Sequence, residues 1–124
     1  MQLDVIRARA RAEIERLYDG RCTIYRYVQG KAAGGENIKT REELYSDVSC
    51  RLSYDSAPAA SDSDTVDTLA QDITLFLPPE ADVPAGCYIV VSQAGKTQTY
   101  QNSGHPKVYF THQEIKLDVV KDRV

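Results

Sequence analysis

Few residues of this 124-residue chain combine the types and the spacing that chemistry requires. Gly95-Lys96-Thr97 matches the end of a phosphate-binding P-loop, but Val90 stands where that loop would begin with glycine. A strand is predicted to follow, whereas a P-loop needs a helix whose N-terminus holds the phosphate. Ala94-Gly95 instead fits a hairpin turn, because glycine adopts positive φ at little cost. We therefore predict no nucleotide site and no cofactor.

The two histidines and three cysteines form no metal-binding or nucleophilic pattern. His112 is expected on the polar face of the last strand, and His105 in a loop. The cysteines are widely spaced and include no C-x-x-C pair, which argues against a zinc site. We interpret Cys22, Cys50 and Cys87 as buried, small apolar side chains in a reducing compartment. The sequence thus predicts no catalytic residue, no metal site and no enzyme.

Length and composition fit one soluble globular domain over residues 1–124. The chain is 42% hydrophobic and 27% charged, as is usual for such a domain. Its formal net charge of −3 gives no overall attraction to nucleic acid or acidic lipid. No apolar run approaches the roughly 20 residues that span a bilayer, and Asp4 and Arg7 interrupt any signal-peptide core. We expect synthesis in the cytoplasm and no membrane contact.

Residues 2–18 are predicted to form a helix. Apolar residues recur there at three- and four-residue steps and form one stripe: Leu3, Ile6, Ala10, Ile14 and Leu17. Two Arg–Glu pairs on the polar face are spaced for ion pairs: Arg9–Glu13 and Arg11–Glu15. Gly20 is expected to end the helix in the left-handed conformation. The stripe must pack against something, either the rest of the chain or another protein.

Residues 21–121 are predicted to consist of strands with short connections. Six segments have strand-forming composition or alternating polarity: 21–28, 43–54, 73–77, 87–93, 96–101 and 108–120. The glycine-containing segment 29–40 is predicted to be a loop. Strands without intervening helices favour antiparallel pairing, and a small closed barrel or tight sandwich hides the sheet edges. We therefore predict a mainly β fold, a small antiparallel β-barrel of about six strands with an N-terminal α-helix.

Between two of these strands lies an acidic segment without lysine or arginine. Residues 55–72 contain five aspartates, together with Ala, Ser and one proline. Such a composition cannot bury enough apolar surface to order itself. We predict a long mobile inter-strand loop over residues 53–69. Its candidate functional residues are Asp55, Asp62, Asp64 and Asp67.

The order and spacing of several strand segments resemble one protein family. The hairpin segment Gly95–Gly104 reads GKTQTYQNSG and is followed by HQEIKL at His112–Leu117. Three earlier segments precede them in matching order: Cys22–Tyr25, Val48–Ser53 and Asp72–Leu77. Together these marks resemble the head-closure proteins of long-tailed bacteriophages, also called stopper or head-completion proteins. The resemblance covers most of the chain.

The resemblance implies a structural head–tail connector. Proteins of this family are β-barrels that dock as a ring on the portal and adaptor complex after DNA packaging. They retain the packaged genome and give the tail its attachment surface. We accordingly expect an adaptor or portal ring and a tail-completion protein as partners, and self-association into a ring such as a dodecamer, from a chain that is a monomer when free. The expected location is the virion neck, with only non-specific contact to genomic DNA.

The resemblance also assigns roles to two parts of the chain. The loop over residues 53–69 would project into the central channel, where its aspartates would discourage DNA from adhering to the wall. The N-terminal helix would dock on a partner, with four candidate residues: Arg7, Arg11, Ile14 and Leu17. Whether this helix packs on its own barrel or on a neighbouring ring is left open by the sequence.

Two other classes of protein fit the sequence less well. One is another neck or tail-completion protein, similar to a tail terminator, which would have no need of an acidic channel loop. The other is an OB-like binding module for nucleic acid or sugar, which would need a basic or aromatic groove. The arginines of the predicted helix could contact DNA phosphate, although a solvated charged face is the commoner arrangement.

Overall fold

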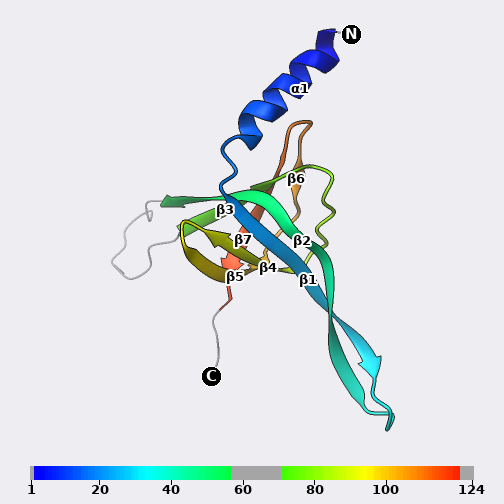
Figure 1. The fold of residues 1–124 in the computed structure, drawn as a ribbon. Helices are drawn as coiled ribbons and strands as arrows, with labels where there is room; N and C mark the ends of the chain where they lie inside the picture. The colour runs from blue at the N-terminus through cyan, green and yellow to red at the C-terminus, as the bar shows by residue number, and fades with distance from the viewer. Residues whose placement is uncertain (1, 57–70, 121–124) are drawn as a thin grey trace.

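The fold consists of one helix followed by antiparallel strands (Figure 1). The computed structural model describes residues 2–56 and 71–120. Its elements are α1 (Gln2–Glu15), β1 (Gly20–Lys31), β2 (Asn37–Ser56), β3 (Gln71–Leu77), β4 (Tyr88–Gln93), β5 (Lys96–Asn102), β6 (Lys107–Val108) and β7 (Gln113–Val119). All seven strand pairings within these residues are antiparallel. The predicted mainly β, antiparallel class with an N-terminal helix is confirmed.

The strand pairings connect the first half of the chain to the second. β1 pairs with β2 and β4, β2 also pairs with β3, and β4 also pairs with β5. β7 then pairs with both β5 and β3. Six strands therefore have a hydrogen-bonded neighbour on each side, which satisfies backbone groups that would be costly to bury unpaired. The two-residue β6 pairs with β7 and extends the sheet there.

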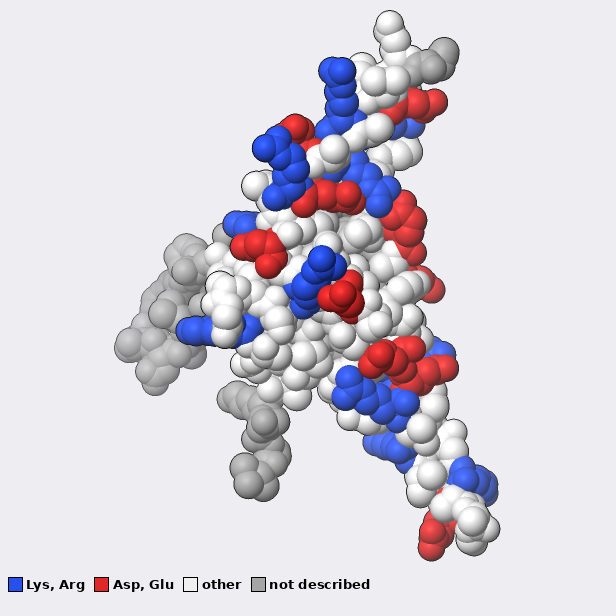
Figure 2. All heavy atoms as spheres, in the orientation of Figure 1, with Lys and Arg blue, Asp and Glu red and all other residues white. Residues whose placement is uncertain are grey.

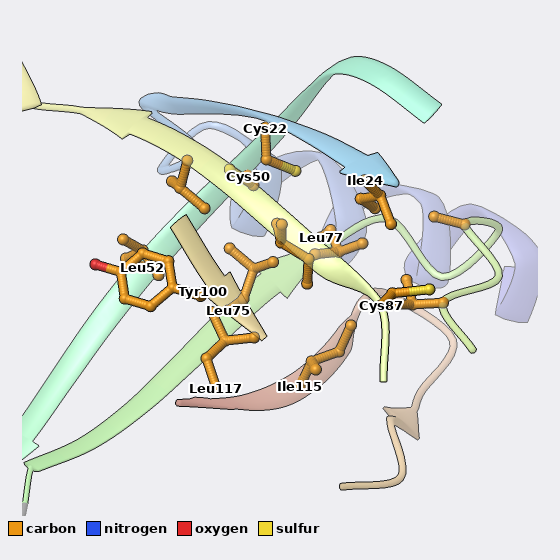
Figure 3. Close-up of a cluster of buried hydrophobic side chains, with 14 of the residues drawn as sticks. Cys22, Ile24, Cys50, Leu52, Leu75, Leu77, Cys87, Tyr100, Ile115 and Leu117 are labelled. Carbon is orange, nitrogen blue, oxygen red and sulfur yellow. The ribbon is translucent and has the colours of Figure 1, made fainter. Parts of the chain in front are cut away.

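The inward-facing side chains of the strands form one hydrophobic core (Figure 3). Fully buried apolar side chains come from five of the strands: Ile24, Cys50, Leu75, Leu77, Ile89 and Ile115. The predicted burial of Cys22, Cys50 and Cys87 is confirmed, and all three thiols are free. Burial raises the pKa of the Cys87 thiol, which disfavours the reactive thiolate. These cysteines therefore act as core residues.

The chain between α1 and β1 differs from the prediction. α1 ends at Glu15 rather than at residue 18, and its last turn tightens where the Leu17 N–H donates to the Ile14 carbonyl at 3.0 Å. Gly20 is not a left-handed helix cap; it is the first residue of β1 and pairs with Cys50. Space for a side chain is limited there, because a Cβ atom would lie 2.9 Å from Gln93 Oε1 and 3.2 Å from the carbonyl oxygens of Cys50 and Ser92.

Segment 29–40 is not the predicted loop. β1 and β2 continue through it as a hairpin ribbon that projects from the other strands (Figure 1) and closes with a turn over residues 32–36. We call residues 26–42 the arm. Cys22 pairs with Val48 but Ile24 pairs with Tyr45, so β2 has an extra residue at this β-bulge. Asp47 adopts φ 56° in the same place. Bulges bend a ribbon, and here the ribbon leaves the other strands.

The predicted final strand over residues 108–120 is broken into two. β6 ends at Val108, and the chain turns back where the Tyr109 N–H donates to the His112 carbonyl at 2.8 Å. β7 then begins at Gln113, whose buried side-chain amide donates to the Pro78 carbonyl at 2.8 Å. The β-favouring residues between the two strands were misleading, because strand propensity largely reflects packing against neighbours.

The Ala94-Gly95 turn between β4 and β5 is confirmed. Both residues have positive φ, 55° at Ala94 and 79° at Gly95. This is the pattern of the type I′ hairpin turn, which matches the twist of the flanking strands. Gly95 adopts this conformation at no steric cost, whereas the Cβ of Ala94 is strained by it.

Gly20→Ala is expected to destabilise the fold by about 1–3 kcal/mol, because the new methyl group would press on Gln93 and on two backbone carbonyls. The matched control is Gly30→Ala in the arm, where a Cβ atom would have its nearest neighbour at 3.8 Å. Urea denaturation of the two variants gives the comparison. Equal stabilities would contradict the close approach at Gly20.

Ala94→Asn is expected to stabilise the fold by roughly 0.5–1 kcal/mol, because asparagine tolerates the left-handed conformation better than alanine. Ala85→Asn is the control: Ala85 is also exposed in a connection between strands, and it lacks positive φ. Thermal or urea denaturation should show a gain for the first variant alone. A gain at both positions would exclude turn conformation as the cause.

Candidate interaction surfaces

The helix α1 stands away from the strands (Figure 1), and Arg11 joins it to the connection that follows β3. Arg11 Nη1 and Nη2 donate to the two carboxylate oxygens of Glu80, both at 2.7 Å, and Nε donates to Glu15 at 2.7 Å. Glu80 and Glu15 raise the pKa of Arg11, and the Arg11 guanidinium lowers the pKa of Glu80. A two-pronged Arg–carboxylate contact fixes orientation as well as distance. Arg11, a predicted docking residue, is thus engaged within its own chain.

The predicted Arg11–Glu15 pair is confirmed, and the predicted Arg9–Glu13 pair is not observed. Glu13 instead accepts from Arg16, three residues later, at 3.1 Å. Both arrangements join neighbours on one helix face. Arg9 has no ion-pair partner among the residues that the structure describes.

The other three predicted docking residues lie at the surface between α1 and the β6–β7 turn. The Arg7 guanidinium lies 3.7 Å from the centre of the Phe110 ring, in the position of a cation–π contact. Ile14 is half-buried and Leu17 is 60% exposed. No residue of α1 is buried. The structure therefore places Arg7, Arg11 and Ile14 on α1 and Leu17 in the turn that follows it, and it leaves most of the apolar stripe uncovered.

The turn between β6 and β7 adds exposed apolar side chains beside the helix. Val108 and Phe110 are 62% and 69% exposed, and they line a groove with Ile6 and Ala10 of α1. A second recess at the helix base is lined by Ile14, Leu17, Tyr18, Arg51, Phe76 and His112. We call the exposed stripe of α1 together with residues 108–110 the helix groove.

The Tyr18 hydroxyl, beside this second recess, is buried without a hydrogen-bond partner among the described residues. Burial raises the pKa of Tyr18 to about 12. A buried hydroxyl without a partner costs free energy.

An aromatic cluster stiffens the base of the arm. The Tyr25 and Tyr88 rings stack with centroids 5.5 Å apart, and Tyr27 packs edge-on at 5.5 Å from Tyr88. The Arg41 guanidinium lies 3.7 Å from the Tyr25 ring centre, and burial raises the pKa of Tyr25. The sequence analysis missed this cluster, although Tyr25 and Tyr27 alternate as residues on one strand face do. Cross-strand aromatic packing of this kind holds the projecting ribbon.

The arm carries charges of both signs (Figure 2). Arg26 Nε donates to Glu42 at 2.8 Å, and the Arg41 guanidinium lies 3.9 Å from the Glu43 carboxylate. Arg26 and Arg41 therefore each have a nearby carboxylate. Tyr27 and Ile38 are the exposed large apolar side chains of the arm.

The predicted acidic loop is only partly within the described residues. Asp62, Asp64 and Asp67 lie in the segment 57–70, outside them. Residues 53–56 belong to β2, where the backbone of Asp55 pairs with Asp72 of β3, so the loop prediction was wrong for these four residues. The ladder is longer than expected because polar strands remain stable where a partner pairs with their backbone.

Near the end of β2, a side chain takes the place of a neighbouring strand as a hydrogen-bond partner. β1 begins at Gly20, so β2 loses that neighbour beyond Cys50. The Leu52 N–H donates to Gln93 Oε1 at 2.8 Å, and Gln93 Nε2 donates to the Leu52 carbonyl at 3.3 Å. The Gln93 amide thus satisfies backbone groups that β1 would otherwise pair. These polar groups have structural partners and no arrangement suited to a reaction.

His112 lies in the turn before β7 rather than on the face of a strand, and its side chain is 16% exposed. Its Nε2 lies 2.9 Å from Glu114 and its Nδ1 lies 2.9 Å from the Thr111 hydroxyl. The ring stacks on Tyr109 with centroids 4.9 Å apart. In the part of the chain that the structure describes, no group of three or more His, Cys, Asp or Glu side chains is placed to hold a metal ion.

Comparisons of the chain with protein-family models, with curated protein sequences and with solved structures find no match. Within residues 2–56 and 71–120, no helix has the length and apolar character needed to cross a membrane.

Glu80→Gln is expected to loosen α1, because it removes the charged partner of the Arg11 fork. Hydrogen exchange of α1 amides, corrected for intrinsic rates, should become several-fold faster while exchange in β4 is unchanged. The folded state lowers the pKa of Glu80, so its contribution is present at neutral pH and is lost as the pH falls through that lowered pKa. Acidification should therefore loosen α1 in the natural chain more than in Glu80→Gln.

The matched control is Glu13→Gln, whose carboxylate accepts from Arg16 of the same segment rather than from the strands. It should leave α1 protection close to that of the natural chain. Equal effects of the two substitutions would show that the contact between Arg11 and Glu80 does not hold the helix.

Proposed function

We propose that this chain is a structural head–tail connector subunit of the head-closure class. The observation that carries the proposal is the shape of the molecule: a small β body bears two projections, α1 and the arm, that extend in different directions (Figure 1). Both projections expose large apolar side chains, among them Ile6 on α1 and Ile38 on the arm. Such a shape suits a protein that contacts several neighbours at once. The sequence resemblance suggests that this assembly is the head–tail connector of a bacteriophage.

We infer that the β body is a closed barrel. Its support is the cycle of pairings β1–β2–β3–β7–β5–β4–β1, in which each strand has two neighbours. Closure removes exposed sheet edges, which would otherwise invite uncontrolled pairing between copies. A barrel also gives the projections a rigid base, as a ring subunit under load requires.

In this proposal the arm contacts the next subunit of a ring. Along the arm, β1 extends beyond its ladder with β4, which ends at Tyr25. Within the described residues, the outer edges of the arm have no further strand partner, so they offer backbone groups for strand addition by a neighbour. Exposed Tyr27 and Ile38 would supply apolar contact beside those hydrogen bonds.

The acidic segment would face the DNA path. Its aspartates repel a polyanion, which suits a gate that DNA must pass without adhering. We expect the triple substitution of Asp62, Asp64 and Asp67 by Lys to slow genome release in an ejection assay. Unchanged ejection kinetics would argue against the electrostatic role.

The decisive experiment is deletion of the gene in the phage or prophage that encodes the chain, followed by induction. We expect tailless capsids that package DNA and then lose it, scored by negative-stain microscopy and by DNase-protected genome. Stable, DNA-filled heads without tails would move the protein to the tail side of the joint, as a tail-completion protein. Normal particles would overturn both assignments.

Complementation with arm variants tests the ring contact separately. Ile38→Lys should fail to restore tailed particles, because it places a charge in the proposed subunit contact. Lys39→Ala, on the opposite strand face, should restore them. Full rescue by Ile38→Lys would exclude this contact while leaving the connector role to be judged by the deletion.

A further inference from the structure

The apolar stripe of α1 faces sideways, neither toward the strands nor directly away from them. Its members Leu3 and Ile6 are 54% and 60% exposed, and Leu17, in the turn just after the helix, is 60% exposed. The half-buried residues of α1, which mark the side facing the strands, are Arg7, Arg11, Ile14 and Glu15. Successive residues are about 100° apart around a helix, which puts the centre of the stripe about 80° from that side. A second helix therefore has access to the stripe.

The helix needs such a cover. A helix of this length is marginal in water when nothing packs on its apolar face, and no residue of α1 is buried. Its described side-chain contacts with the strands and their turns include the Arg11–Glu80 fork and the Arg7–Phe110 contact. The helix groove, with Val108 and Phe110 on its other wall, leaves room for another apolar helix.

The stripe is symmetric about Ala10. Within α1, Ile6 and Ile14 are each four residues from it; Leu3 and Leu17 are each seven residues from it, with Leu17 in the turn just after the helix. If two such helices cross in opposite directions at Ala10, each isoleucine of one copy meets the other isoleucine of the second copy. The small side chain at the crossing lets the helix axes approach to roughly 8 Å.

Charge on the open flank of the stripe favours this direction. Arg9 and Glu13 lie on the same flank, away from the strands, and both are exposed. In an antiparallel pair the same flanks of the two helices meet. Arg9 of each copy then lies within about 3 Å, along the axis, of Glu13 of the other copy. A parallel pair would instead place Arg9 near Arg7 and Arg11, and like charges would repel.

We propose that two copies of this chain associate through their α1 helices, antiparallel and centred on Ala10. The contact is isologous, so every interaction occurs twice. This dimer differs from our expectation that the free chain is a monomer. The proposal does not depend on the head-closure assignment. In a larger assembly the same face would have to be released before α1 could dock on another protein.

The first test is the mass of the full chain in solution. Sedimentation equilibrium at neutral pH, up to about 100 μM, should show a species of twice the 13.8 kDa chain mass. Ile6→Lys should raise the dissociation constant at least tenfold. Val5→Lys is the matched control, because Val5 is 54% exposed on the other side of the helix, and it should leave the constant nearly unchanged. A monomer at all concentrations overturns the proposal, as do equal effects of the two lysines.

The second test fixes the direction by disulfide trapping. In the antiparallel pair, Ile6 of one copy lies beside Ile14 of the other, while identical positions are about 12 Å apart. An equimolar mixture of Ile6→Cys and Ile14→Cys should therefore form oxidised dimers, whereas each variant alone should not. The natural cysteines are buried, so the unsubstituted chain is the background control. Dimers from either single variant would indicate a parallel or different contact and would overturn the proposal.

Discussion

The pairing of β3 with β7 is the constraint on which the rest of the structure depends. Five residue pairs, from Ile73–Leu117 to Leu77–Gln113, bring the C-terminal strand against the first half of the chain. Without them, β3 and β7 would each have an unpaired edge, and the core between them would be open to water. Leu75, Leu77 and Ile115, all at this seam, are fully buried. Backbone pairing and core burial therefore depend on each other here.

Where the strand ladders end, side-chain amides complete the hydrogen bonding. Gln113 donates to the Pro78 and Ala81 carbonyls and ties the connection after β3 to the start of β7. Asn102 donates to the Pro84 carbonyl at 3.2 Å and accepts from the Gly104 N–H at 3.0 Å. Buried polar groups are costly unless they are paired, and amides offer both a donor and an acceptor. These amides make the ends of a small body as well defined as its strands.

The body and the helix α1 are stabilised in different ways. Apolar burial and backbone ladders hold the body, and the β1–β2 ladder continues into the arm, whereas α1 is joined to the body by side-chain contacts such as Arg11–Glu80. On both projections, side chains such as Ile6 and Ile38 remain exposed. An element that projects from the body keeps its outer surface for another molecule. That exposure underlies both the connector proposal and the proposed helix pairing.

Local pattern alone predicted the elements whose character depends on near neighbours in the sequence. The alternating polarity of residues 43–54 correctly predicted that Cys50 and Leu52 are buried. The Ala94-Gly95 pair correctly predicted a hairpin turn. Both are local properties of the sequence. The sequence also predicted the helix and its apolar stripe, although the last turn of the predicted helix, after Glu15, is not helical. The class of fold followed from strands without intervening helices.

Only the tertiary structure decided what depends on residues far apart in the chain. The arm exists because residues 26–31 pair with 37–42, which outweighs the glycines that suggested a loop. The space available at Gly20 depends on the approach of Gln93. The strand breaks between β6 and β7 because β6 pairs back onto Gln113. Arg11 binds Glu80, which is 69 residues away in the sequence. Sequence period reports which face of an element is apolar, and only the fold determines what that face meets.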